Sequence, residues 1–294
     1  MAGGGASGTA SLGAWLRRRS WLLLLLPGIV TTGFLFVWPL GIMTIRSLTD
    51  PEVGISNYTK FFDTPSAVTS LVTTVRISAI VTVVTAVLGY MYAFTMFAAA
   101  PATRRVLMAA VILPMAVSLL VRTFALQAIL RDTGIINMAL EALGLIADPL
   151  PLIRNQFSVS VGMVSMLLPF MVLPLYNTMT GIDERMLLAA SGLGASPRRV
   201  FLDVFFPLSL PGLTAGCLVV FVSSLGFYVV PALLGGGSEQ FLSQVIFDRV
   251  RRLGDFGYGS AIGVIMLVLT MLILGIAARF VKLDRVFGQT VGAR

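Results

Sequence analysis

Long apolar runs separated by short polar segments make up most of the chain. Six such runs, each of roughly 20 residues or more, cover residues 21–45, 68–97, 106–129, 159–179, 210–234 and 261–281. About 20 consecutive apolar residues let an α-helix cross the hydrocarbon core of a bilayer. The pattern therefore predicts an all-α polytopic membrane protein with six transmembrane helices. Residues 21–283 would form one six-span domain between tails at 1–20 and 284–294.

The start of the first run also has features of a secretory signal peptide. Arg17, Arg18 and Arg19 directly precede it, as the positive region of a signal peptide would. The run is too long for such a peptide, however, and no small-residue cleavage site follows its leucines. We therefore interpret it as an uncleaved first span.

The amino-acid composition limits the kinds of functional site that the chain can form. Charged residues make up 12% of the chain, against about 25% in soluble domains, and the mean hydropathy is +0.94. The chain has no histidine and one cysteine, Cys217, inside an apolar run. Disulfide frameworks, zinc sites and histidine-based catalysis are therefore excluded. We expect no catalytic residue and no metal site.

The charges of the chain are unevenly distributed between the two sides of the membrane. With the N-terminus inside, one side of the membrane carries twelve basic and four acidic residues, and the other carries nine of each. The whole net charge of +8 then lies on the cytoplasmic side, as the positive-inside rule requires. We therefore expect cytoplasmic termini and no nucleic-acid partner, and we place residues 183–211 in the cytoplasm.

Residues 183–211 lie between the fourth and fifth runs, and their pattern predicts two short helices with a break. Asp183 can cap the first helix, and Glu184 is favourable near its positive end. Gly194 can take the left-handed conformation that ends a helix.

The second short helix is expected to start just after this break. Ser196 would cap it, with Pro197 at its first position, where a missing N–H costs nothing. Pro207 and Pro211 would close the unit and lead into the next span.

The same segment resembles the EAA loop of bacterial ABC-importer permeases. That loop has the form Glu-Ala-Ala, three residues, Gly, a spacer, then Leu-Pro, and the matching positions here are Ala189, Ala190, Gly194 and Pro207. The Ala-Ser-Pro that follows the glycine also matches, at Ala195, Ser196 and Pro197. The resemblance implies a coupling helix on which ATPase subunits dock.

Two positions depart from the loop's pattern. Leu188 replaces the glutamate and Phe206 replaces the leucine before the proline. The loss of the glutamate puts in doubt any ion pair made there, and with it the strength of ATPase docking. The alternative interpretation is an amphipathic helix that lies on the membrane surface.

The segments predicted to lie outside resemble those of the permeases that handle spermidine and putrescine. The shared pieces are Asn57-Tyr58 before the second span, the Gly-x-x-Asn of Gly134 and Asn137, and residues 231–236, Pro-Ala-Leu-Leu-Gly-Gly. Short helices are expected at 139–146 and 241–253. Together with the EAA-like loop, the resemblance covers residues 21–283.

Polar and aromatic residues within the runs are candidates for a translocation pathway. Arg76 and Arg122 lie toward the outer ends of their runs and can reach the interface, but Arg122-Thr123 also resembles a pair in the polyamine-type permeases. Further candidates are Tyr176, Asn177, Ser223, Ser224, Phe227 and Tyr228. An acidic residue commonly stands at the position of Phe227 in the polyamine members, and the six runs contain no Asp or Glu.

The resemblance implies the type I ABC importer permease fold and a subunit that forms half of a pathway in the bacterial inner membrane. It implies a second homologous permease subunit, two ATPase subunits that bind the ATP and magnesium, and a periplasmic solute-binding protein. This chain has no Gly-Lys-Ser/Thr nucleotide loop and is expected to bind no cofactor. A polyamine is the default solute, and an opine, amino acid or phosphonate-type solute remains open. A secondary transporter or a membrane-embedded enzyme would need intramembrane carboxylates or other reactive groups.

Overall fold

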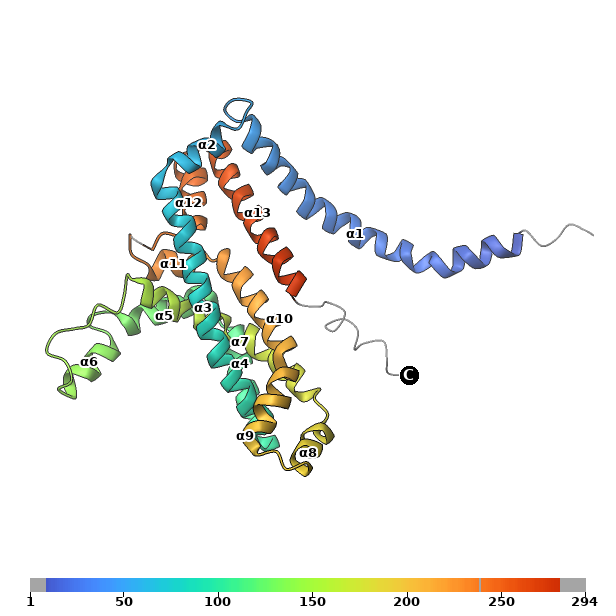
Figure 1. Cartoon of the computed structure of the whole chain (residues 1–294). Coiled ribbons are helices and arrows are strands. Elements are labelled where there is room, and N and C mark those ends of the chain that lie inside the picture. Colours follow the sequence, from blue (N-terminus) through green and yellow to red (C-terminus); the bar gives the residue numbers. More distant parts are fainter. Residues whose placement is uncertain (1–8, 238, 281–294) are drawn as a thin grey trace, which may run out of the picture.

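The computed structural model describes residues 9–237 and 239–280, and every regular element in these two stretches is helical (Figure 1). The first helix, α1 (Thr9–Thr49), runs without interruption across the boundary expected at residue 20. The tail predicted at 284–294 lies outside the described residues, as does the start of the chain before Thr9.

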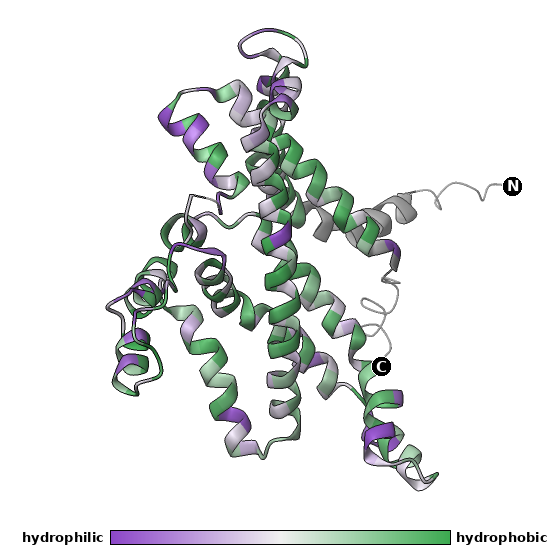
Figure 2. Cartoon of the chain, turned by 60° about the vertical axis from the view of Figure 1, so that its left-hand side comes forward, coloured by the Kyte–Doolittle hydropathy of each residue, from purple (hydrophilic) through white to green (hydrophobic). Residues whose placement is uncertain are grey.

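Five helices in the described part are long and apolar enough to cross a membrane. They are the span of α1 from Leu25 to Thr49, α3 (Pro65–Ala98), α7 (Gln156–Thr180), the helix Pro197–Leu225, and α13 (Phe256–Phe280) from Phe256 to Ala277. Figure 2 shows hydrophobic residues along most of their length. The apolar pattern therefore located these spans correctly, and the total of six stays a prediction.

The third predicted run does not form one straight helix. It is divided into α4 (Pro101–Ile112), a 3₁₀ turn η1 (Leu113–Ala116) and α5 (Leu119–Leu130), and α6 (Ile135–Ala142) follows. The pieces before and after the break are bent by 103°. Pro114 lacks the N–H that would bond the preceding turn, and Val117 is extended, with φ −85° and ψ 136°. The single helix expected at 106–129 was wrong.

The fifth predicted run also has different bounds. Its helix starts at α9 (Pro197–Arg199), continues through a π-helix, η2 (Val200–Phe205), and becomes α10 (Phe206–Leu225). The chain then breaks and resumes as α11 (Val229–Leu234). Pro207 and Pro211 therefore lie within a continuous helix and do not close a separate unit, which corrects the expectation. Membrane helices tolerate such prolines when neighbouring groups satisfy the freed carbonyls.

Three helices, α3, α7 and α10, pack against one another to form the main core. Glycines make the close approach possible: a Cβ on Gly89 or Gly216 would lie within 2.6 Å of the Met171 side chain. Small residues at such interfaces let membrane helices pack through dispersion forces. By contrast, the span of α1 contacts mainly α13, and Ser47 is the one buried side chain between Leu25 and Thr49.

A second, smaller core lies at the end where α2 (Ser56–Asp63) and α12 (Leu242–Phe247) meet α13. Phe61, Leu242 and Tyr258 are fully buried there. A π-helix, η3 (Asp248–Arg252), continues α12, so the helix predicted at 241–253 is confirmed. The helix predicted at 139–146 is displaced toward the N-terminus, since α6 covers Ile135–Ala142.

Candidate functional site

The segment with the EAA-like pattern forms a tip at one end of the molecule, opposite α2 and α12 (Figure 1). Its first helix is α8 (Glu184–Gly192), and Asp183 Oδ1 accepts a 2.9 Å hydrogen bond from the N–H of Arg185. Gly194 ends the helix with φ +86°. Both local predictions, the acidic cap and the left-handed glycine, are confirmed.

The cap predicted for the second helix differs in detail. Ser196 occupies the N-cap position and Pro197 follows at the first helical position, but the Ser196 side chain accepts no hydrogen bond there. Both residues are exposed, so water can satisfy the N–H groups of this first turn. The serine hydroxyl is therefore not needed as a cap.

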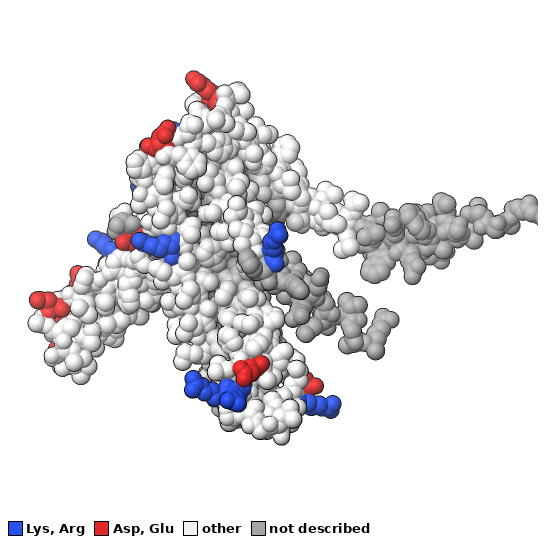
Figure 3. All heavy atoms as spheres, in the orientation of Figure 1, with Lys and Arg blue, Asp and Glu red and all other residues white. Residues whose placement is uncertain are grey.

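Helix α8 has two different faces. Leu187 packs inward against the main core, while Leu188 and Leu193 are 69% and 90% exposed. Ala189 between them is also exposed. Acidic and basic side chains flank the tip in Figure 3. The tip thus presents apolar side chains and small residues outward, and Leu188 is an exposed apolar residue where the EAA pattern has a glutamate.

Arg122 lies on α5 and is half-buried. Its Nε atom is buried and has no hydrogen-bond partner in the part of the chain that the structure describes. Thr123 beside it is fully buried and donates to the carbonyl of Leu119 at 2.7 Å. Arg76, on α3, is exposed. Of these two arginines, Arg122 is the one with unsatisfied hydrogen-bonding capacity.

The break between α10 and α11 contains two pathway candidates. The backbone carbonyl of Phe227 accepts a 2.6 Å hydrogen bond from Ser243 Oγ. The centre of the Tyr228 ring lies 4.8 Å from the centre of the Phe247 ring. Ser223 is half-buried, but Ser224 is fully buried and donates to the carbonyl of Phe221.

Tyr176 and Asn177 lie elsewhere. They are near the end of α7, where Thr178 approaches Gly212 of α10. Ser224 is twelve residues farther along α10, which corresponds to about 18 Å at ~1.5 Å per residue. The structure does not gather all the candidates at one place. It puts α11, next to Tyr228, against the α5 helix that carries Arg122.

Asn57 and Asn137, from two of the motifs shared with the spermidine and putrescine permeases, stabilise their loops by hydrogen bonds. Buried Asn57 donates hydrogen bonds to the carbonyls of Ser47 (3.0 Å) and Asp50 (2.7 Å). Asn137 is also buried, donates to the carbonyls of Arg131 and Leu150, and accepts the N–H of Leu150. Each asparagine binds backbone groups of its own loop, 6 to 13 residues away in the sequence, so its first role is structural.

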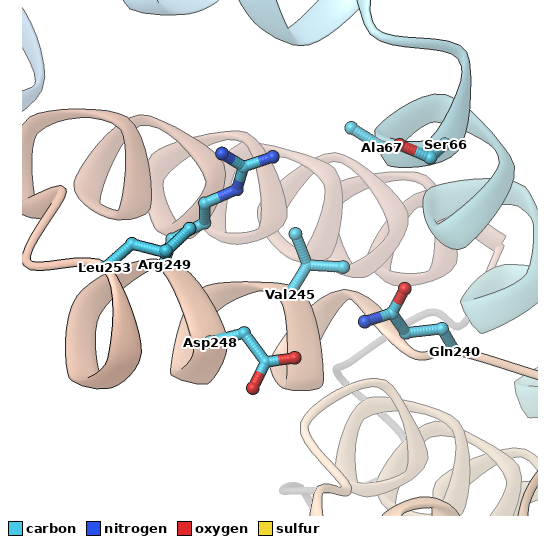
Figure 4. A pocket seen from close by; sticks show the side chains of 7 residues that line it. All are labelled: Ser66, Ala67, Gln240, Val245, Asp248, Arg249 and Leu253. Carbon is cyan, nitrogen blue, oxygen red and sulfur yellow. The ribbon is translucent and has the colours of Figure 1, made fainter. Parts of the chain in front are cut away.

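Two hollows adjoin each other between the start of α3 and the segment 237–253. The first, of about 230 Å³, is drawn in Figure 4, and the second is about 240 Å³. Ser66 and Gln240 line both, and Asp248 and Arg249 line the first. Asp248 is paired with Arg252 at 3.0 Å. The first hollow is lined by one acidic and one basic side chain and the second by no charged side chain, so they indicate no single class of ligand.

Comparison with known proteins shows which family and which relatives the chain matches. Residues 85–283 match the family model described as the binding-protein-dependent transport system inner membrane component. The chain is 33% identical over 231 residues to the spermidine/putrescine transport system permease protein PotB of Haemophilus influenzae, covering 79% of this chain and 80% of the relative. It is 32% identical over 220 residues to PotB of Escherichia coli, covering 75% and 80%.

A solved structure with a similar fold is the bacterial alginate ABC transporter in complex with its alginate pentasaccharide-bound periplasmic protein. The TM-score is 0.75 at 16% identity, over 92% of this chain and 96% of the other. At this identity the likeness concerns the fold alone.

Proposed function

We propose that this chain transports a polyamine of the spermidine and putrescine class. The chain belongs to the family of binding-protein-dependent transport system inner membrane components and is a permease subunit of an ABC importer. The observation that supports this solute is the 33% identity to a spermidine/putrescine permease over 79% of the chain. The expected activity is ATP-dependent uptake, with the ATP hydrolysed by separate subunits.

The full architecture in this proposal has six spans, with the bent pair α4–α5 counted as the third. The tip at 183–197 is the coupling helix between spans four and five, on which the ATPase subunits dock. A second homologous permease subunit would complete the pathway, and a periplasmic binding protein would deliver the solute. The exposed Leu188 and Leu193, together with the left-handed Gly194, support this role for the tip.

The experiment that tests the solute is uptake into proteoliposomes that contain the complete transporter. Spermidine loaded on the binding protein is expected to accumulate inside when ATP is present on the ATPase side. Putrescine should compete, and 2-aminoethylphosphonate and a neutral amino acid should not. ATP-dependent uptake of either control solute, with none of spermidine, would reassign the substrate while leaving the permease function intact.

The topology makes a separate prediction. In a Cys217→Ser background, a cysteine at Val53 should react with an impermeant thiol reagent added from outside, and one at Ser196 only after the cytoplasmic face is opened. Val53 is 88% exposed and Ser196 is also exposed, so both positions are accessible within this chain. Labelling with the opposite sidedness at either position would reverse the proposed orientation.

The substrate's charge makes another prediction. Asp203 is the one acidic residue of the helix Pro197–Leu225 and is exposed near the tip, and α3 and α7 contain none. A polyamine would then pass over aromatic faces such as that of Tyr228, each providing about 2 kcal/mol when desolvated. Tyr228→Ala should therefore slow spermidine uptake severely, and Arg122→Ala should have a smaller effect.

The two variants distinguish the alternatives because an anionic solute would use Arg122. Both variants are also assayed with the anionic 2-aminoethylphosphonate in case that solute is the one taken up, and loss of its uptake in Arg122→Ala but not in Tyr228→Ala would indicate an anionic solute. Unchanged uptake in both variants would place the route elsewhere in this subunit. Arg76→Ala serves as the control, because that arginine is exposed and lies outside the α5–α11 region.

A further inference from the structure

Six aromatic rings connect α3 with the helix that follows the tip. Three come from α3 (Tyr90, Phe94 and Phe97) and three from the start of the Pro197–Leu225 helix (Phe201, Phe205 and Phe206). We refer to these six residues as the aromatic cluster. Its two halves are more than 100 residues apart in the chain, so only the tertiary structure brings them together.

The contacts between the halves are close and specific in orientation. The Phe94 ring lies 5.2 Å from Phe201 and 5.4 Å from Phe205, edge-on to both. Phe205, 3% exposed, also lies 5.1 Å from Phe97. Edge-to-face pairs at these separations stabilise packing beyond the area they bury and resist sliding.

A hydrogen bond fixes the inner side of the cluster. Tyr90 Oη and Ser209 Oγ are 2.9 Å apart, and Ser209 Oγ also donates its one hydrogen to the carbonyl of Phe206 at 2.8 Å. Tyr90 is therefore the donor of the shared bond. Ser209 is fully buried, so this bond is shielded from water and ties α3 to α10.

The cluster lies between the tip and the membrane-spanning core. Phe201 and Phe205 are on the π-helix η2, where their rings stack 5.8 Å apart with an angle of 22°. Helix α8 packs directly against η2, and Leu187 contributes from α8 to the same core. A displacement of α8 would therefore move η2 first and, through its rings, the rings of α3. Single π-turns inside longer helices frequently occur at functional sites.

We propose that the aromatic cluster transmits movement of the coupling tip to α3, with Phe94 as the positioning residue that connects η2 to that helix. The proposal rests on the proposed function, because it takes α8 as the site of ATPase docking. Without the α3 rings, movement of η2 would still pass along its own helix into α10, and α3 would follow only through its packing against α10 and no longer through direct contact with η2. Solute binding outside would then be less well coupled to ATP hydrolysis inside.

The test measures the ratio of stimulated to basal ATP hydrolysis by the complete reconstituted transporter, with spermidine-loaded binding protein as the stimulus. Phe94→Ala should lower this ratio by about threefold or more, and Phe94→Tyr, which keeps the ring, should restore it. Phe170→Ala is the matched control: Phe170 is 41% exposed against 36% for Phe94, but makes no ring contact in the described structure. The ratio should be unchanged in the control.

Two results would overturn the proposal: an unchanged ratio in Phe94→Ala, or an equal fall in Phe94→Ala and Phe170→Ala. If Phe94→Ala reduces the amount of assembled transporter, Phe94→Leu replaces it under the same criteria, since leucine keeps the apolar volume without the ring. Failure of the coupling-tip assignment is recognised separately. In that case Gly194→Val would also leave the ratio unchanged, whereas failure of the cluster alone would leave only Gly194→Val uncoupled.

Discussion

Replacing Gly194 by valine is expected to abolish solute-stimulated ATP hydrolysis and transport while leaving the subunit folded. Gly194 has φ +86°, a conformation that costs most L-residues about 1–2 kcal/mol and β-branched residues more. A Cβ at this position meets nothing within 4 Å in the part of the chain that the structure describes, so the fold itself is not overpacked. The substitution therefore changes the backbone at the end of α8 and the surface that this helix presents to a partner.

The measurement is ATP hydrolysis with and without loaded binding protein, on transporter whose assembly is checked by co-purification of the ATPase subunits. Two further variants separate backbone strain from added bulk. Gly194→Asn should retain part of the coupling, because asparagine tolerates the left-handed region. Gly192→Val adds the same bulk two residues earlier, where the backbone is not left-handed. Full transport by Gly194→Val would refute the coupling assignment.

Replacing Gly212 by leucine is expected to have the largest effect on folding. A Cβ there would lie 2.5 Å from Thr178 Oγ1 and 2.9 Å from the backbone carbonyl oxygen of Pro174. Since the carbonyl belongs to α7, the clash can be relieved only by moving α10 away from α7. Overpacking of this kind costs about 1–3 kcal/mol, and leucine adds three more carbons beyond the Cβ.

We expect the detergent-solubilised Gly212→Leu transporter to melt at a clearly lower temperature and to accumulate poorly in the membrane. Gly275→Leu is the matched control, because Gly275 lies in the apolar helix α13 and its Cβ would meet nothing within 4 Å among the described residues. Equal melting temperatures for the two variants would show that the close α7–α10 contact at Gly212 is not required.

Local features were predictable because they depend on neighbours in the chain. The spans in α3, α7 and α13 follow from apolar length alone, since the bilayer sets the length that a helix must have. The acidic cap at Asp183 and the left-handed Gly194 follow from hydrogen bonding and backbone sterics within a few residues. The sequence determined these features without reference to the rest of the fold.

Prolines were the main source of error. Pro114 does divide a predicted span, whereas Pro207 and Pro211 lie within a continuous helix. The residue type is the same in each case, and the outcome depends on whether the π-helix η2 and neighbouring helices accommodate the missing N–H. That accommodation is a property of packing, which local sequence does not specify.

The remaining features of the site required the tertiary structure. Tyr90 lies in the second apolar run and Ser209 in the segment 183–211, so the sequence does not connect them, and their 2.9 Å hydrogen bond exists because α3 and α10 pack side by side. The same packing brings Phe94 to Phe201, and the packing of α10 against α7 forces glycine at position 212. Apolar composition is nearly uniform along these helices, so it determines that they are buried in the membrane but not which faces meet. The shapes of the side chains, through the glycine contacts and the edge-to-face rings, decide that.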